Sequence, residues 1–227
     1  MGRGRWVGVL WVMGLWGLGP PSASAVIVIN EVLADPSAVF GDANGDGVIH
    51  TTQDEFIELV NTGPDAVALA QWTLADLVQV RHRFSDTASI PGLGFFVVFG
   101  GGAPAGFSDV AVASTHSLGL NNTGDTITLR DAQALLIDAL TYGAEGGMDV
   151  SLTRSPDATG AFVQHTSITS RLFSPGTTVD GAATLPGPSP DPVMPEPSSL
   201  LLLGVGLCGL RLVRRHYRPH GPVGPIA

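Results

Sequence analysis

Between residues 26 and 183 the apolar residues come in short runs that alternate with polar residues. Successive side chains of a strand point to opposite faces, so a period of two is typical of half-buried strands. Gly, Pro, Asn and Asp separate the runs and favour turns. No long stretch of this region has the 3.6-residue period of a helix. The pattern therefore predicts an all-β domain, an antiparallel sandwich or barrel.

The expected strands are short and closely spaced. They cover residues 26–32, 55–61, 67–69, 72–75, 82–84, 95–99, 126–130, 135–142, 150–153 and 162–164. Trp72 is the best candidate for a large side chain at the centre of the core, with a ligand-stacking aromatic as the alternative. Asn121 to Asp125 (NNTGD) lies between two apolar runs and predicts a turn rather than an active site.

The N-terminal segment has the features of a secretory signal. Arg3 and Arg5 precede an apolar core at residues 6–18, and Ala23-Ser24-Ala25 is an A-x-A cleavage site. We expect a signal peptide over 1–25, cut after Ala25, so that the body is exported. An uncleaved N-terminal helix is the alternative.

The C-terminal segment predicts a sorting signal. Pro195, Glu196 and Pro197 are followed by an apolar stretch and then by a basic cluster that includes Arg214 and Arg215. The apolar run is shorter than the ~20 residues of a comfortable membrane span, which favours transient insertion. The arrangement resembles the PEP-CTERM signal of Gram-negative bacteria, which implies a membrane segment over 198–218 and an exosortase-type peptidase that cuts near Pro-Glu-Pro. An ordinary C-terminal membrane helix is the alternative.

Charge is unevenly distributed along the chain. The formal net charge is −9, but all 20 acidic residues lie between Glu31 and Glu196, where five arginines leave a balance of −15. A body this acidic repels phosphate backbones, so nucleic-acid binding is not expected, whereas divalent cations are attracted. The single cysteine, Cys208, lies in the apolar tail, so the body contains no disulfide. Residues 184–197 are proline-rich and predict an extended linker after a domain at 26–183.

Several motifs in the body resemble the lamin tail domain. They are INEVLADP (29–36), DEFIELVN (54–61), WTL (72–74), FFVVFGG (95–101), LGLNNTGDTITLRD (118–131), SLTRSPDATGAFVQH (151–165) and SPGTTVDG (174–181). The resemblance implies an immunoglobulin-like antiparallel β-sandwich. It also implies an exported, non-enzymatic binding or structural module.

One loop carries a metal-binding pattern. GDANGDG (41–47) spaces its oxygen-bearing side chains like the first half of a Ca²⁺ loop, and Gly47 permits the sharp turn. The later positions depart from the pattern, with His50 and Gln53 where an oxygen ligand and a bidentate acid are expected. A solvated turn without an ion is the alternative. The candidate ligands of a structural calcium ion are Asp42, Asn44, Asp46, Val48, Asp54 and Glu55.

The remaining polar residues indicate structural roles. The body histidines lack the spacing of a zinc motif. Arg154 and Asp157 are expected to hold a loop by hydrogen bonds. Glu31 and Glu58 lie in strand patterns and are expected to face solvent or the calcium loop.

Three functions remain open. The first is a non-enzymatic cell-surface or extracellular-matrix module that is stabilised by calcium. Its role would be adhesion or the building of polysaccharide-associated material, with extracellular polysaccharide or another surface protein as the partner. The second is a hydrolase that uses the acidic cluster with a divalent metal, and the third is an accessory domain that docks another exported protein.

Overall fold

A computed structural model describes residues 27–187 of the 227-residue chain. The described part is all-β, as predicted. Its strands are β1 (Ile27–Leu33), β2 (Phe56–Asn61), β3 (Val67–Ala68), β4 (Thr73–Ala75), β5 (Val80–Arg83), β6 (Ser89–Ile90), β7 (Phe95–Phe99), β8 (Val110–Val112), β9 (Asp125–Arg130), β10 (Leu136–Tyr142), β11 (Leu152–Ser155) and β12 (Ala161–Gln164). Two single-turn 3₁₀ helices, η1 (Ala144–Gly146) and η2 (His165–Ser167), flank β11 and β12.

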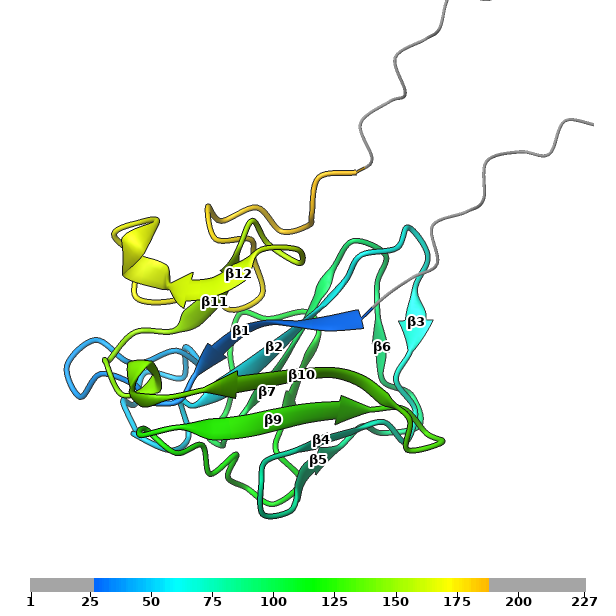
Figure 1. The fold of residues 1–227 in the computed structure, drawn as a ribbon, viewed down its shortest axis with the longest axis horizontal. Helices are drawn as coiled ribbons and strands as arrows, with labels where there is room; N and C mark the ends of the chain where they lie inside the picture. The colour runs from blue at the N-terminus through cyan, green and yellow to red at the C-terminus, as the bar shows by residue number, and fades with distance from the viewer. Residues whose placement is uncertain (1–26, 188–227) are drawn as a thin grey trace, which may run out of the picture. The chain divides into compact units, whose positions relative to one another are not determined.

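The strands form two main sheets. The larger has the order β12-β11-β1-β2-β7-β8 and the smaller the order β10-β9-β4-β5. A short β3–β6 ribbon lies beside them (Figure 1). Pairing is antiparallel except between β7 and β8, where Val97 is opposite Val110 in a parallel register.

The main core lies between the two sheets. Ile29 and Leu59 of the larger sheet and Leu74 and Ile127 of the smaller one are all fully buried there. The prediction that Trp72 occupies the centre of this core is wrong, because Trp72 is only partly buried and packs at its edge. Buried phenylalanines replace it, such as Phe84, which packs edge-on against Phe96 at 5.4 Å.

A bulge in β1 determines which residues face the other side of the larger sheet. Ile29 is opposite Leu59 and Glu31 is opposite Glu58, so Asn30 is the extra residue between them. The extra residue reverses the alternation of side chains along the strand. As a result Val32 rejoins Ile29 in the main core, while Leu33 packs in a second cluster on the outer face of the sheet.

The C-terminal part of the described chain covers this outer face. Phe173 packs edge-on against Phe56 of β2 at 6.4 Å, and Leu185 joins a small cluster formed by Val60 and Phe95. The Leu185 amide donates to the Leu93 carbonyl at 2.8 Å. The larger sheet is therefore buried on both faces, which explains why β2 and β7 are buried at every position.

All ten expected strands are present, with ends that differ from the expected ones by at most two residues. Two strands were not expected. The first, β6, is only two residues long, and the second, β8, forms the parallel pair with β7. The prediction of a purely antiparallel sandwich is therefore wrong at this edge.

Neither 3₁₀ turn between Ile27 and Gly187 is long or apolar enough to cross a bilayer. The signal peptide expected at 1–25 and the sorting segment expected at 198–218 lie outside the described residues, as does most of the linker.

Candidate functional site

The aspartate-rich loop connects β1 to β2 at one end of the sandwich. Its side chains satisfy its own backbone: Asn44 Oδ1 accepts from the Asp46 amide at 3.0 Å, and Asp46 Oδ1 accepts from the Val48 amide at 2.9 Å. Asp46 Oδ2 accepts from the Ala103 amide at 3.0 Å. These amides lower the pKa of Asp46. The loop thus keeps an acidic side chain charged.

Asp54 anchors the loop through its side-chain carboxylate. It is fully buried, and its two carboxylate oxygens accept from the amides of Asn44 at 3.0 Å and His50 at 2.7 Å. Burial raises the pKa of Asp54 against the effect of these bonds. Asp54 therefore binds the loop backbone at two points, residues 44 and 50.

Asp42 differs from its neighbours because one of its oxygens has no partner. Its Oδ2 accepts from the Gly47 amide at 3.1 Å, but its buried Oδ1 has no hydrogen bond within the described residues. A buried carboxylate oxygen without a donor is costly. A bound cation is one way to offset this cost, so Asp42 fits the predicted metal site.

Five of the six predicted calcium ligands take part in the hydrogen bonds of this loop: Asp42, Asn44, Asp46, Val48 and Asp54. The sixth, Glu55, points elsewhere, because its Oε2 accepts from the Leu120 amide at 3.4 Å. Burial raises the pKa of Glu55 to about 7. Within residues 27–187 no three acidic, histidine or cysteine side chains converge as metal ligands. Any ion here would rely on Asp42 and Asp46 with amide and carbonyl oxygens.

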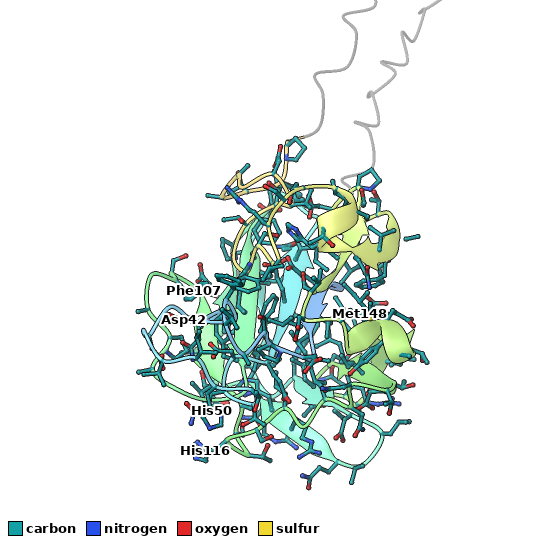
Figure 2. The ribbon with its side chains drawn as sticks, turned by 90° about the vertical axis from the view of Figure 1, so that its left-hand side faces the viewer. Asp42, His50, Phe107, His116 and Met148 are labelled. Carbon is teal, nitrogen blue, oxygen red and sulfur yellow. The ribbon has the colours of Figure 1, made fainter. Side chains whose placement is uncertain are left out.

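The loop is docked onto the segment that follows β7. Asn44 donates from Nδ2 to the Gly101 carbonyl at 3.4 Å, and the Ala105 amide donates to the Asn44 carbonyl at 2.9 Å. Gly102 lies so close that an added Cβ would fall 2.5 Å from Asp46 Oδ2. Figure 2 looks onto this end of the sandwich and labels Asp42 and His50 on the loop.

A second acidic cluster lies on the outer face of the larger sheet. Glu31 and Glu58 are paired across β1 and β2, and both are fully buried. The prediction that they face solvent or the calcium loop is wrong, because the C-terminal segment covers them. Glu31 accepts from the hydroxyl of Ser151 at 2.6 Å and from the Ser174 amide at 2.9 Å. Glu58 accepts from the Gly176 amide at 2.6 Å.

Asn30, the bulged residue, links this pair to a third carboxylate. Its Oδ1 accepts from the Ala158 amide at 2.7 Å, which turns its amide nitrogen toward Glu58 at 2.9 Å and Asp157 at 3.1 Å. Asp157 in turn accepts from the Val179 amide at 3.2 Å. The expectation that Asp157 and Arg154 hold a loop is confirmed, since Arg154 also donates to the carbonyls of Ile29 and Gly160.

His165 completes the cluster and was not singled out from the sequence. Its Nε2 lies 2.9 Å from the Ser174 hydroxyl, which itself contacts Glu31 Oε2 at 2.7 Å. Burial raises the pKa of Glu31 to about 7 and raises that of Glu58 well above its usual value. Burial lowers the pKa of His165. The only sequence signal for this cluster is the pairing of two acidic residues with apolar strand neighbours.

A groove of about 320 Å³ lies between β5, β6 and β8. His82, Phe84, Phe96 and Asp109 are among its lining residues. Burial lowers the pKa of His82 to about 4, so the imidazole is neutral. Since Phe84 and Phe96 are almost fully buried, the groove offers little aromatic surface for stacking.

The predicted processing residues, Ala25, Pro195, Glu196, Pro197, Arg214 and Arg215, lie outside the described residues.

The two facing sheets define the described part of the chain as an immunoglobulin-like β-sandwich. The family profile of the lamin tail domain matches residues 20–144. The chain belongs to the lamin tail domain family. The matched part ends after β10, so the motifs at 151–165 and 174–181 lie beyond it. No curated protein matched the chain in a sequence search.

Proposed function

We propose that this chain is an exported, non-enzymatic cell-surface or extracellular-matrix module whose sandwich is stabilised by a calcium ion in the β1–β2 loop. The observation that carries the proposal is the buried Asp42 Oδ1, which lacks a hydrogen-bond donor in a loop spaced like a calcium site. Calcium is a hard cation that prefers carboxylate and carbonyl oxygens, which are the groups that this loop supplies.

The residues fit a structural role for the ion better than a catalytic one. Asp54 already uses both oxygens on backbone amides, and Asp46 does the same. Asp42 Oδ1 is left to bind directly, with the second lone pairs of Asn44 Oδ1 and Asp46 Oδ1 nearby in the loop. The ion would offset the repulsion between Asp42 and Asp54 and hold the loop on the segment at 101–105.

Calcium should therefore raise the melting temperature of the full chain in detergent micelles. The variant Asp42→Asn/Asp46→Asn should lose this rise, because it removes both carboxylates and keeps the side-chain size. Asp65→Asn is the matched control, since it makes the same charge change at an exposed position outside the loop. Differential scanning calorimetry with calcium or with a chelator measures the effect. Equal melting temperatures of the unmodified chain in calcium and in chelator would rule out the ion.

The orientation of the sandwich is consistent with presentation at a surface. β1 and β7 are both antiparallel to β2, so they begin at the same end. Leu185 binds Leu93, just before β7, and the aspartate-rich loop follows β1 at the opposite end (Figure 1). A chain tethered through its termini would therefore hold this loop away from the tether.

Exposed apolar side chains lie in the aspartate-rich loop and in the β4–β5 turn. Val39 and Phe40 are 65% and 73% exposed next to Asp42, and Leu77 and Val78 are 72% and 76% exposed at the β4–β5 turn. Large apolar side chains left this exposed favour a contact with a partner. They support an adhesive role toward polysaccharide or another surface protein.

The export and sorting parts of the proposal rest on the sequence at both ends. A cleaved signal peptide would release the body outside the cytosol, and an exosortase-type peptidase would cut near Pro195-Glu196-Pro197. The arginines from 211 to 218 would then remain on the cytoplasmic side until processing.

A further inference from the structure

The segment at 172–185, which we term the C-terminal strap, lies over the outer face of the larger sheet. Its ends are held by apolar contacts, through Phe173 on Phe56 and through Leu185 beside Val60. Just after Phe173 it is held by polar contacts, because the amides of Ser174 and Gly176 donate to Glu31 and Glu58. The strap also lies beyond the part of the chain that matches the family profile.

The number of hydrogens in the His165–Ser174–Glu31 chain is fixed by its partners. Nδ1 of His165 lies 3.0 Å from the Arg171 carbonyl, which can only accept, and 3.1 Å from the Thr169 hydroxyl, which can accept or donate. An unprotonated Nδ1 would face the lone pairs of the carbonyl, so the favoured tautomer carries its proton on Nδ1. In the neutral ring Nε2 is then an acceptor, and it faces the Ser174 hydroxyl at 2.9 Å. Ser174 has one hydroxyl hydrogen for two acceptors, since Glu31 Oε2 lies 2.7 Å away.

With Nδ1 protonated, both contacts of the Ser174 hydroxyl are satisfied only when one further proton is present. With the proton on Glu31, its hydroxyl donates to Ser174 and Ser174 donates to His165. With the proton on His165, Nε2 donates to Ser174 and Ser174 donates to Glu31. Without this further proton, the Ser174 hydroxyl has no hydrogen to share with one of its two partners, Glu31 or His165. Such an unsatisfied contact costs free energy in a buried site.

The charges around the chain favour the proton on Glu31. Glu58 on β2 and Asp157 in the turn before β12 add negative charge. Arg154 on β11 pairs with Asp138, and Arg171, next to η2, acts against a charged His165. The ion pairs within residues 27–187 join Arg154 to Asp138 and Arg81 to Asp76, so Glu31 and Glu58 have only neutral donors.

We propose that the strap is a proton-controlled latch: one proton held between Glu31 and His165 through Ser174 keeps it on the sheet, and loss of that proton above neutral pH loosens it. Loosening would uncover the apolar outer face around Phe56 and Phe99 and would free the chain that leads to the C-terminal tail. This proposal does not depend on calcium binding or on export.

The direction of the pH effect follows from the pKa values. The raised pKa values of Glu31, about 7, and of Glu58 mean that the folded protein holds these protons more tightly than the unfolded chain. Their contribution to stability is present in mild acid and is lost as the pH rises through about 7. The lowered pKa of His165 acts in the opposite direction, so protonation of His165 costs stability below about pH 6.5.

Hydrogen–deuterium exchange of the full chain in detergent at pH 6 and pH 8 tests the latch. The reporters are the amides of Ser174 and Gly176, and the reference is the Leu59 amide inside the sheet. After correction for intrinsic exchange, we expect the protection of the two strap amides to fall at least about tenfold more than that of Leu59 at pH 8.

The variant Glu31→Gln should remove most of this response, because its carboxamide keeps an acceptor for the Ser174 amide and gives the Ser174 hydroxyl a permanent donor. Glu145→Gln is the matched control, since Glu145 is exposed and its Oε1 accepts from the amide of Gly143, away from the strap. This control should respond to pH as the unmodified chain does.

Two results would overturn the latch. One is an equal change at the strap and at Leu59 in the unmodified chain, and the other is an unchanged pH response in Glu31→Gln. If that variant fails to fold, carbon-13 NMR of the glutamate carboxyls in the unmodified chain decides the question. We expect Glu31 to titrate near pH 7, and a midpoint near its usual 4.5 would contradict the proposal.

Discussion

At the scale of single residues, Asp42 and Asp46 belong to one motif but differ in the hydrogen bonds that their carboxylates accept. Asp46 has its oxygens engaged by amides, whereas Asp42 keeps one buried oxygen without a donor. The spacing of these residues was readable from the sequence. The sequence does not reveal which of them has the unpaired oxygen, because this depends on how the loop lies against the segment at 101–105.

Gly102 should be essential to this arrangement. It has a φ of +75°, and a Cβ there would collide with the side chains of Asn44 and Asp46. We expect Gly102→Ala to lower stability by about 1–3 kcal/mol and to weaken the calcium response. Chemical denaturation measures the loss. Gly106→Ala is a control with a similar φ of +89° and open space around its Cβ, so it carries the backbone strain alone. Equal losses in the two variants would show that contact with the loop does not matter.

The two buried glutamates show the limit of reading a sequence locally. The strand pattern predicts that Glu31 and Glu58 face solvent or the calcium loop, because acidic residues are rarely buried. The extra residue Asn30 in β1 and the strap, which is distant in sequence, together bury them. Neither effect leaves a local signal, and the same holds for His165.

At the scale of elements, the strands were predictable and their partners were not. Short apolar runs, many of them alternating with polar residues, predict ten strands, including β7 at its observed bounds. They miss β6, which has two residues, and β8, whose three half-buried residues pair in parallel with β7. Pairing depends on long-range geometry, which the period of a pattern does not encode.

The strap depends on Phe173 for its apolar anchor. We expect Phe173→Ala to destabilise the chain by about 1–2 kcal/mol, because Phe173 is only half-buried and a fully buried Phe would cost more. It should also raise exchange of the Ser174 amide more than that of Leu59, since the strap opens locally. Phe162→Ala, another half-buried Phe in contact with the main core, is the matched variant. A larger effect at Ser174 from Phe162→Ala would contradict the anchor.

At the scale of the whole molecule, the chain combines a described β-sandwich with two termini that are interpreted from sequence. Its membership of the lamin tail domain family is established by the match over residues 20–144. The acidic balance of the body predicts repulsion of nucleic acid and attraction of divalent cations. The termini of the described chain lie at the end of the sandwich opposite the aspartate-rich loop, which suits a tethered module.

Mass spectrometry of the chain recovered from fractionated cells of its source tests the central claim most directly. We predict a polypeptide outside the cytosol that begins at Val26 and, once sorted, ends near Pro195-Glu196-Pro197. An intact 227-residue polypeptide, soluble in the cytosolic fraction with both apolar ends attached, would contradict the account.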